Sequence, residues 1–553
     1  MADWFEKRTL GGLLDNAGQR FGSREALCYE GQRCTFVELQ EQTNRTARAL
    51  IHLGVQPGDK VSLWMTNRLE WLHILFAVAK IGAVLVPINT RFRTADTEYV
   101  LRQSDSTTLI TLDRSGPVDY LGMVEEVCPE INNGNPGNLH AARFPKLQRV
   151  IVLGDARRPG TWNWDDAMAA ADEVSPNQLE RREHAVNPDD TVLLMYTSGT
   201  TGFPKGVMHN HNIQRTLIDT ANRMGMTSRD VILMYLPLFH AFGLYEGAIM
   251  SIVSGARMVL MNAFDPGEVL KLIEQEMATV LNGFDTHFFD LTSHPDCATT
   301  DLSSLRTALF AAGMASSEPA ARLAQKALCP TITGWGMTEV GVGATLSFLD
   351  SPEDDRCLAS GHPLPGYEFK VIDPETGTTQ PPGTLGELCV RGYGLMQGYY
   401  HKPEETAQAI DSEGWFHTGD VATLRDDECM RFFGRYKDLL KVGGENVDPM
   451  EVEAFLLAHS AVNKVQVIGV PDQRLSEVPC ACVVLEPGAE LTLEGMDAFC
   501  RGKLGSFKIP RHLLLMDEYP MTSSGKVQRS QCRKLYHEGK LKVLHEWVNG
   551  KAV

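Results

Sequence analysis

The segment 196–206, Tyr-Thr-Ser-Gly-Thr-Thr-Gly-Phe-Pro-Lys-Gly, places glycines, hydroxyl side chains and one cation directly after the apolar run 192–195. Small residues let backbone N–H groups approach an anion closely, and the hydroxyls add further donors. Lys205 adds a mobile positive charge, so the segment is predicted to bind a polyphosphate. A flexible surface loop is the alternative interpretation of such a composition. Walker A chemistry is disfavoured, because Lys205 is followed by Gly206 and not by Ser or Thr.

The segment 333–339, Thr-Gly-Trp-Gly-Met-Thr-Glu, places an aromatic residue between two glycines and an acid shortly after it. The ring of Trp335 could stack on a flat base, and the carboxylate of Glu339 could hold Mg²⁺, which prefers oxygen ligands. Taken alone, the Thr/Glu pair is equally typical of a helix start.

Three further segments carry charged residues beside glycines. The segment 414–420 ends in Asp420, which could accept hydrogen bonds from ribose hydroxyls; a turn Asp after Gly is the alternative. The segment 434–446 gathers three cations around a glycine pair, where a solvated linker is the alternative. The segment 520–529 puts Lys526 on a glycine-containing loop, although an exposed surface lysine is the ordinary interpretation.

Length and composition limit the class of protein. With 553 residues, 43% hydrophobic and 22% charged, the chain is predicted to be globular and to form at least two domains. A net charge of −18 argues against a nucleic-acid partner. The 12 cysteines include no Cys-x-x-Cys pair, which favours reduced thiols over disulfides or structural zinc. Without a secretory signal or an integral membrane segment, a cytoplasmic protein is expected.

Apolar periodicity predicts the elements that must position these segments. Helices are expected at 36–53 and 69–81 and strands at 61–65 and 83–86, which favours βαβ units in a parallel sheet. A second α/β region is expected over 191–332. Short runs at 369–372 and 386–391 predict an antiparallel β subdomain. The final unit is expected to contain a helix at 450–457 and strands at 465–470 and 481–485.

Taken in order, these segments resemble those of the adenylate-forming (AMP-binding) superfamily, in particular its acyl-CoA synthetase or fatty-acid–CoA ligase branch, from about Thr35 to about Arg529. The resemblance implies an α/β fold, α+β in part. A large N-terminal domain of two doubly wound α/β subdomains plus a β subdomain would occupy 1–434. A hinge would occupy 435–438, and a small mobile α+β C-terminal domain 439–553.

The resemblance also implies a role for individual residues. The nucleotide would be bound by Thr197, Ser198, Gly199, Thr200, Thr201, Gly202, Lys205, Gly313, Gly334, Trp335, Gly336, Met337, Thr338, Asp420, Arg435 and Lys526. The acyl pocket would be formed by His240, Phe242, Tyr245, Gly313 and Gly341, with Gly343 nearby. CoA would be bound by Lys441, Gly443, Gly444 and Asn446, and Lys437 would be the hinge residue. The catalytic group would be Lys526, Glu339, Thr200 and Lys441, with Thr200 and Glu339 at the metal.

Two details bear on this assignment. Trp335 stands where the family more often has Tyr, a change that keeps a stacking face. His209 and His211 follow the phosphate loop, where the family starts a helix, so a metal role for them is disfavoured.

The reaction that the resemblance implies has two steps, with Mg²⁺ as cofactor and ATP and CoA as co-substrates. A carboxylate first attacks ATP to give acyl-AMP and pyrophosphate, and a thiol then takes the acyl group. Lys526 would offset the repulsion between the two anions. A medium- or long-chain fatty acid is favoured, and an aromatic or alicyclic acid is next. Loading of a carrier protein and nucleotide binding without turnover remain alternatives, and a homodimer is a compatible assembly.

Overall fold

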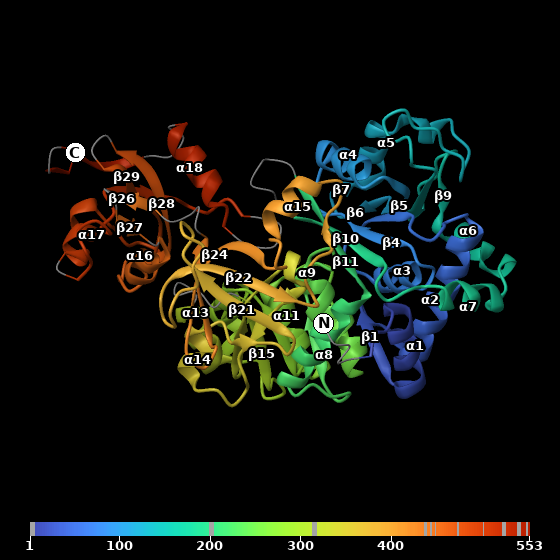
Figure 1. Cartoon of the computed structure of the whole chain (residues 1–553), viewed down its shortest axis with the longest axis horizontal. Helices are drawn as coiled ribbons and strands as arrows, with labels where there is room; N and C mark the ends of the chain where they lie inside the picture. Colours follow the sequence, from blue (N-terminus) through green and yellow to red (C-terminus); the bar gives the residue numbers. More distant parts are fainter. Residues whose placement is uncertain are drawn as a thin grey trace.

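The computed structural model describes residues 6–197, 204–311, 318–435, 440–442, 445–447, 449–472, 475–501, 503–521, 527–538, 543–548 and 551–552. Two large sheets, a smaller antiparallel sheet and a separate C-terminal lobe make up these ranges, with the C-terminal lobe at one end of the molecule (Figure 1). Within the described part of the chain, no helix combines the length and the apolar character needed to cross a membrane.

The first large sheet has the strand order β23-β11-β10-β4-β3-β5-β8-β9 within the described residues. Its strands are β3 (Lys60–Trp64), β4 (Val84–Pro87), β5 (Ser106–Leu112), β8 (Arg149–Leu153), β9 (Trp162–Asn163), β10 (Thr191–Thr197), β11 (Lys205–Asn210) and β23 (Gly398–Tyr399). Strand β11 pairs antiparallel with both β10 and β23, and the other neighbouring strands of the sheet are parallel. The parallel βαβ units predicted from periodicity are therefore present.

The second large sheet has the order β16-β15-β14-β12-β13-β1-β2 across the described ranges. Its strands are β1 (Glu25–Tyr29), β2 (Gln32–Thr35), β12 (Val231–Met234), β13 (Arg257–Leu260), β14 (Val280–Gly283), β15 (Thr307–Ala311) and β16 (Thr331–Gly334). All neighbours are parallel except β1 and β2.

The division between the two sheets differs from the sequence-based expectation. The region 191–332 does not form one sheet, because β10 and β11 join the first sheet, while β1 and β2 from the N-terminus join the second. Helix α2 (Phe36–His52) carries the chain from one sheet to the other, and Thr35 and Glu38 close its first turn with a reciprocal capping box. Local periodicity identifies a strand but not its partner, which explains the difference.

Helices cover the faces of these sheets (Figure 1). Those of the N-terminal part are α1 (Leu10–Phe21), α2, α3 (Leu69–Lys80), α4 (Thr94–Gln103), α5 (Tyr120–Val127), α6 (Trp164–Ala169), α7 (Pro176–His184), α8 (Gln214–Arg223), α9 (Ala241–Gly243), α10 (Met250–Ser254), α11 (Pro266–Glu276), α12 (Asp285–Ser293), α13 (Glu318–Ala327), α14 (Glu353–Leu358) and α15 (Pro403–Ala409). A π-helical segment, Leu244–Ile249, joins α9 to α10.

The predicted antiparallel β subdomain is the sheet β21 (Tyr367–Ile372), β22 (Gly386–Gly392), β24 (Phe416–Leu424) and β25 (Met430–Arg435), in that order. The C-terminal lobe contains β26 (Leu440–Val442), β27 (Glu445–Val447), α16 (Pro449–Leu456), β28 (Val462–Asp472), β29 (Ser476–Leu485), α17 (Leu493–Cys500), β30 (His512–Leu515), α18 (Arg529–His537), β31 (Val543–Val548) and β32 (Lys551–Ala552).

The two parts have separate hydrophobic cores. The main core gathers buried residues between Leu10 and Met430, and the core of the lobe gathers those between Leu440 and Cys532. All twelve cysteines are free thiols. The core separation is compatible with the domain boundary predicted at 435–438, which itself stays a prediction.

A buried ion cluster joins three helices of the N-terminal part. Lys80 of α3 is 1% exposed in its side chain, and its Nζ lies 2.5 Å from Oδ2 of Asp15 in α1 and 3.1 Å from Oε2 of Glu183 in α7. Two acids share one cation in a site with little water, so removal of the cation leaves both charges unpaired.

We predict that Lys80→Met lowers the free energy of unfolding by about 3 kcal/mol, because it leaves two half-buried carboxylates facing each other. The loss of unfolding free energy would be measured from the first transition in a urea denaturation curve. The control is Lys271→Met, which removes an exposed pair with Glu268 and should leave the midpoint unchanged. An equal effect of both substitutions would contradict the structural role of the cluster.

Candidate active site

The site is organised around Asp420, a buried carboxylate held from two sides. Its Oδ2 accepts a hydrogen bond from Nε1 of Trp335 at 2.9 Å, and its Oδ1 lies 3.0 Å from Nε of Arg435. Trp335 follows the carboxyl end of β16, and Arg435 is the register partner of Asp420 across β24 and β25. Three of the residues predicted to meet the nucleotide are thus brought together.

A bulge in β24 presents Asp420. Thr418, Gly419 and Asp420 face the single residue Leu388 of β22, since the register moves between Glu387 and Cys389. The Thr418 hydroxyl donates to the Leu388 carbonyl at 2.7 Å and accepts from the Asp420 amide at 3.0 Å. Gly419 adopts φ +68°, a conformation that side chains with a Cβ disfavour.

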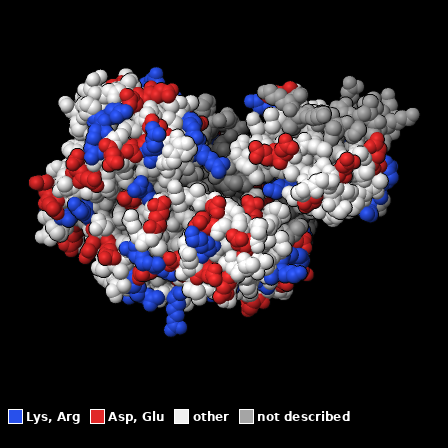
Figure 2. Space-filling view, turned by 180° about the vertical axis from the view of Figure 1, so that it is seen from behind, with Lys and Arg blue, Asp and Glu red and all other residues white. Residues whose placement is uncertain are grey.

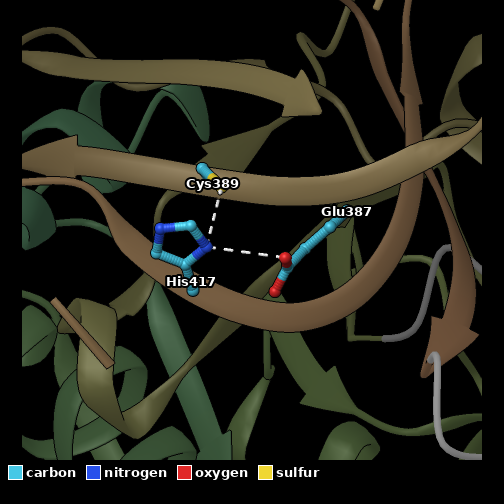
Figure 3. Close-up of side chains that lie close together, drawn as sticks. All are labelled: Glu387, Cys389 and His417. Carbon is cyan, nitrogen blue, oxygen red and sulfur yellow. Dashed lines mark hydrogen bonds and ion pairs between the residues drawn. The ribbon is translucent and has the colours of Figure 1, made fainter. Parts of the chain in front are cut away.

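Side chains on the neighbouring strand support this bulge. Oε1 of Glu387 accepts from the Gly419 amide at 3.1 Å, and its Oε2 lies 3.5 Å from Nδ1 of His417 (Figure 3). The same nitrogen lies 3.7 Å from Sγ of Cys389, and Nε2 of His417 lies 3.4 Å from Oδ2 of Asp411. The charged and polar groups around the bulge therefore form one connected network.

The same trio has the composition of a metal site. Among the described residues, Glu387, Cys389 and His417 form the group whose ligand atoms converge, all within 4.8 Å of one another. Each of them already has a protein partner, however, and burial together with the Glu387 charge raises the pKa of Cys389 to about 12. A protonated thiol is a poor ligand, so we assign the trio to support of the bulge.

The backbone around Trp335 is packed so closely that its flanking glycines are required. A Cβ on Gly336 would lie 1.3 Å from the carbonyl oxygen of Val342, and one on Gly334 would lie 2.6 Å from that of Thr345. The Trp335 amide donates to the Thr345 hydroxyl at 3.0 Å. Trp335 itself is 5% exposed. Stacking of its ring on adenine stays a prediction.

Tyr399 joins the end of the phosphate loop to the predicted metal residue. Its hydroxyl donates to Oε1 of Glu339 at 3.1 Å, and Nζ of Lys205 lies 4.7 Å from the centre of its ring. Burial, followed by the Glu339 charge, raises the pKa of Tyr399 far above its ordinary value, so the hydroxyl stays a donor. Glu339 is 8% exposed and offers only carboxylate oxygens, the ligand type that Mg²⁺ prefers.

The helix expected at His209 and His211 is absent. His209 lies in β11, which pairs with both β10 and β23, and His211 opens a single 3₁₀ turn, His211–Ile213, before α8. Burial lowers the pKa of each ring to about 4, so both are neutral. Nε2 of His209 contacts the Thr338 carbonyl oxygen at 2.6 Å, and Nδ1 of His211 accepts from the Leu10 amide at 3.0 Å.

The residues predicted for the acyl pocket fall into two groups. His240 and Phe242, at the start of α9, both lie against the ring of Phe284, with centroid distances of 6.5 and 5.3 Å. Tyr245, in the second group, is fully buried. Its ring contacts the His209 ring edge-on, with a centroid distance of 6.3 Å. Gly341 adopts φ +77° directly after the turn Thr338–Val340, two residues beyond Glu339.

The remaining predicted residues are described in part or not at all. Thr197 ends β10, and Met337 forms the short strand β17 (Gly336–Met337) with Gly336. Lys441 of β26 and Asn446 of β27 are register partners. Those that lie outside the described residues are Ser198, Gly199, Thr200, Thr201, Gly202, Gly313, Lys437, Gly443, Gly444 and Lys526.

Sequence reasoning missed Tyr399 and Glu246. Tyr399 carries no local signal, because its partners Glu339 and Lys205 are far away in the chain. Glu246 does carry one, since it is the single charged residue in the apolar stretch 241–253. A buried acid in such a stretch is unusual enough to mark a functional position.

Comparison with known families decides the wider assignment. A model described as "AMP-binding enzyme" matches residues 14–400, and one described as "AMP-binding enzyme C-terminal domain" matches residues 451–526. The chain belongs to the AMP-binding enzyme family.

Relatives place it within that family. It is 38% identical over 530 residues to "Putative acyl-CoA synthetase YngI" of Bacillus subtilis (strain 168), covering 95% of this chain and 96% of the relative. It is 34% identical over 540 residues to "Medium-chain acyl-CoA ligase ACSF2, mitochondrial" of Macaca fascicularis, covering 95% and 87%. A solved anthranilate CoA ligase, AuaEII with anthranoyl-AMP, is similar with a TM-score of 0.85, 27% identity and coverage of 98% and 99%. The chain is therefore an acid–thiol ligase of the acyl-CoA synthetase branch.

We predict that Trp335→Phe raises the KM for ATP about tenfold with a smaller change in kcat. The substitution keeps an aromatic face but removes the donor to the buried Asp420 carboxylate, and a hydrogen bond to a charged group contributes roughly 1.5–3 kcal/mol. Pyrophosphate release at varied ATP would measure both constants.

Trp415→Phe is the matched control, because Trp415 belongs to the same subdomain but contacts Lys370 and Arg391 and not Asp420. Its KM for ATP should match that of the unsubstituted protein. An unchanged KM in Trp335→Phe would show that the indole N–H does not prepare Asp420 for the nucleotide.

Proposed function

We propose that the chain is an ATP-dependent acyl-CoA synthetase that converts a medium- or long-chain fatty acid to acyl-AMP and then to acyl-CoA. The observation that carries the proposal is the contact of Asp420 with both Trp335 and Arg435. A buried acid beside an aromatic ring and a guanidinium suits a ribose and its base, and it lies next to the carboxyl edge of a parallel sheet, where such ligands bind.

The side chains around this contact would divide the work of the first step. Asp420 would accept hydrogen bonds from the ribose hydroxyls, and Lys205 would neutralise phosphate charge. Lys526 would bridge the incoming carboxylate and the α-phosphate. Because two anions must meet, positioning and charge neutralisation supply most of the catalysis.

The donor set near the phosphates suits Mg²⁺. Glu339 offers carboxylate oxygens, and its neighbour Tyr399 orients it by a hydrogen bond. Thr200 would be the second contributor. When bound, the ion would withdraw charge from the phosphate oxygens.

The second step would use the C-terminal lobe. Lys441 and Asn446 pair across the hairpin of β26 and β27, and Gly443 and Gly444 lie between them in the sequence, so one hairpin would face the pantetheine arm of CoA. Rotation about Lys437 would bring this hairpin forward and withdraw Lys526. We place the reaction in the cytoplasm, in keeping with the free thiols.

The name of the ACSF2 relatives supports a medium-chain acid. One observation favours a second candidate, an aromatic or alicyclic acid: His240 and Phe242 meet Phe284 in a cluster of rings that suits a flat substrate. The name of the anthranilate ligase points the same way.

The test is a panel of acids assayed for pyrophosphate release with saturating ATP and CoA. We expect release with octanoic or longer fatty acids, and acyl-CoA in the product by mass spectrometry. Faster release with benzoic-type acids would select the second candidate. ATP binding without release for any acid would contradict both.

We predict that Lys526→Ala lowers the rate of acyl-AMP formation by at least 100-fold but leaves transfer from a preformed acyl-AMP to CoA within a few-fold. The physical reason is that the ammonium offsets repulsion only while the carboxylate and the phosphate approach each other. The two half-reactions would be measured separately.

Lys534→Ala is the control, since Lys534 lies in α18 of the C-terminal lobe and its side chain is 63% exposed. It should impair neither half-reaction. Equal loss of both steps in Lys526→Ala would rule out this division of labour.

A further inference from the structure

Glu246 is a buried acid that the reaction described above does not use. It lies in the π-helical segment Leu244–Ile249, next to Tyr245, and is 2% exposed. The Gly343 amide donates to its carboxyl group, and a Cβ built on Gly343 would lie 3.1 Å from Oε1. Its Oε2 has no hydrogen-bond partner among the described residues.

A second polar atom without a partner lies against the same residue. Asn282, in β14, donates from Nδ2 to the backbone carbonyl of Glu246 at 2.8 Å, which fixes the orientation of the amide. Its Oδ1 is fully buried and has no hydrogen-bond partner in the described structure. Two atoms without a partner among the described residues therefore belong to residues that are hydrogen-bonded to each other at the junction of β14 and the π-helical segment.

This junction adjoins the nucleotide segment and the acyl residues. Asn282 stands one residue before the carboxyl end of β14, in the parallel sheet whose strand β16 leads into Trp335. Gly343, which contacts Glu246, is the register partner of Gly336, directly after Trp335. The carboxyl edge of a parallel sheet is where substrates bind in this class of fold.

The two atoms have complementary hydrogen-bonding character. Burial raises the pKa of Glu246 well above its ordinary value, which favours the protonated carboxyl group, and a proton on Oε2 would make that atom a donor. Oδ1 of Asn282 is an acceptor. Each buried group left unpaired costs about 1–3 kcal/mol, and a hydrocarbon chain next to them would relieve neither. A hydroxyl group accepts one hydrogen bond and donates another, so a hydroxyl lying between the two atoms would satisfy both.

We propose that Glu246 and Asn282 form a polar subsite of the acyl pocket that binds a hydroxyl group on the tail of the carboxylic acid. This inference rests on the proposed function and narrows its substrate class to hydroxy-substituted acids. Glu246 donates to the hydroxyl oxygen, and the hydroxyl hydrogen is donated to Asn282. Tyr245 and the apolar residues of the π-helical segment surround the rest of the tail.

The test compares octanoic acid with a series of its monohydroxy isomers, in which the hydroxyl moves along the chain. The kcat/KM for pyrophosphate release is measured for each acid with ATP and CoA. In the unsubstituted protein, we expect one position of the hydroxyl to raise kcat/KM at least tenfold over octanoic acid, since one well-placed hydrogen bond in a dry pocket supplies that much.

Two variants and a control assign the preference to Glu246. Glu246→Leu keeps the volume but removes the donor, so the tenfold preference should vanish while octanoic acid is still activated. Glu246→Gln keeps a donor and should retain part of the preference, which provides a test if the Leu variant folds poorly. Met250→Leu changes a buried residue with no polar hydrogen four positions further along, at the start of α10, and should keep the full preference.

Two outcomes would overturn the inference while leaving the ligase activity established. One is a higher kcat/KM for octanoic acid than for every hydroxy isomer, which would indicate that a buried water pairs with Glu246 and Asn282. The other is an equal preference in Glu246→Leu and in the unsubstituted protein. Absence of pyrophosphate release with every acid would overturn the proposed function together with the subsite.

Discussion

The burial of one carboxylate constrains most of the site. Asp420 carries its charge in a nearly dry position, which is stable only because Trp335 and Arg435 both contact it. These three residues come from the end of β16, from the bulge of β24 and from the end of β25. The large parallel sheet and the antiparallel subdomain are thereby fixed relative to each other where the ribose would lie. The bulge itself depends on Glu387, whose Oε1 accepts a hydrogen bond from the Gly419 amide.

A second constraint is that the Tyr399 ring lies between a cation, Lys205, and an acid, Glu339, that would both act on the nucleotide phosphates. The Lys205 ammonium lies over the ring of Tyr399, whose hydroxyl holds Glu339, so the cation and the acid are ordered without forming an ion pair with each other. An aromatic ring between the Lys205 ammonium and the Glu339 carboxylate costs less free energy than a buried salt bridge would, if a phosphate must later enter between these two groups. On the face drawn in Figure 2, acidic and basic side chains are interspersed.

Much of this architecture follows from the sequence. Helices α2 and α3 and strands β3 and β4 match the predicted positions to within one or two residues, because their apolar patterns are strong, and α2 also has a local capping box. Asp420, Trp335 and Arg435 were each identified from a short motif, and the structure brings them into contact.

Other features depend on partners that are distant in the sequence. The segment 205–210 is a strand and not a helix because β10 on one side and β23 on the other satisfy its backbone, and β23 lies about two hundred positions later. Distant partners also explain why β1 and β2 join the second large sheet while β10 and β11 join the first. Tyr399 is informative only through its contacts, whereas Glu246 is marked both by its apolar sequence context and by its burial.

Arg435 connects Asp420, the residue proposed to bind the ribose, to the proposed domain motion. It is the last residue of β25, it pairs with Asp420, and the predicted hinge begins at this residue. Contacts between the N-terminal part and the C-terminal lobe include the Lys464 ammonium over the Phe289 ring at 5.4 Å, a partly buried interaction that a rotation could exchange at small cost. Under the proposed function, ribose hydroxyls would compete with the Arg435 guanidinium for the Asp420 carboxylate. Nucleotide binding and the position of the lobe would then be coupled through one ion pair, without any need for a longer path through the protein.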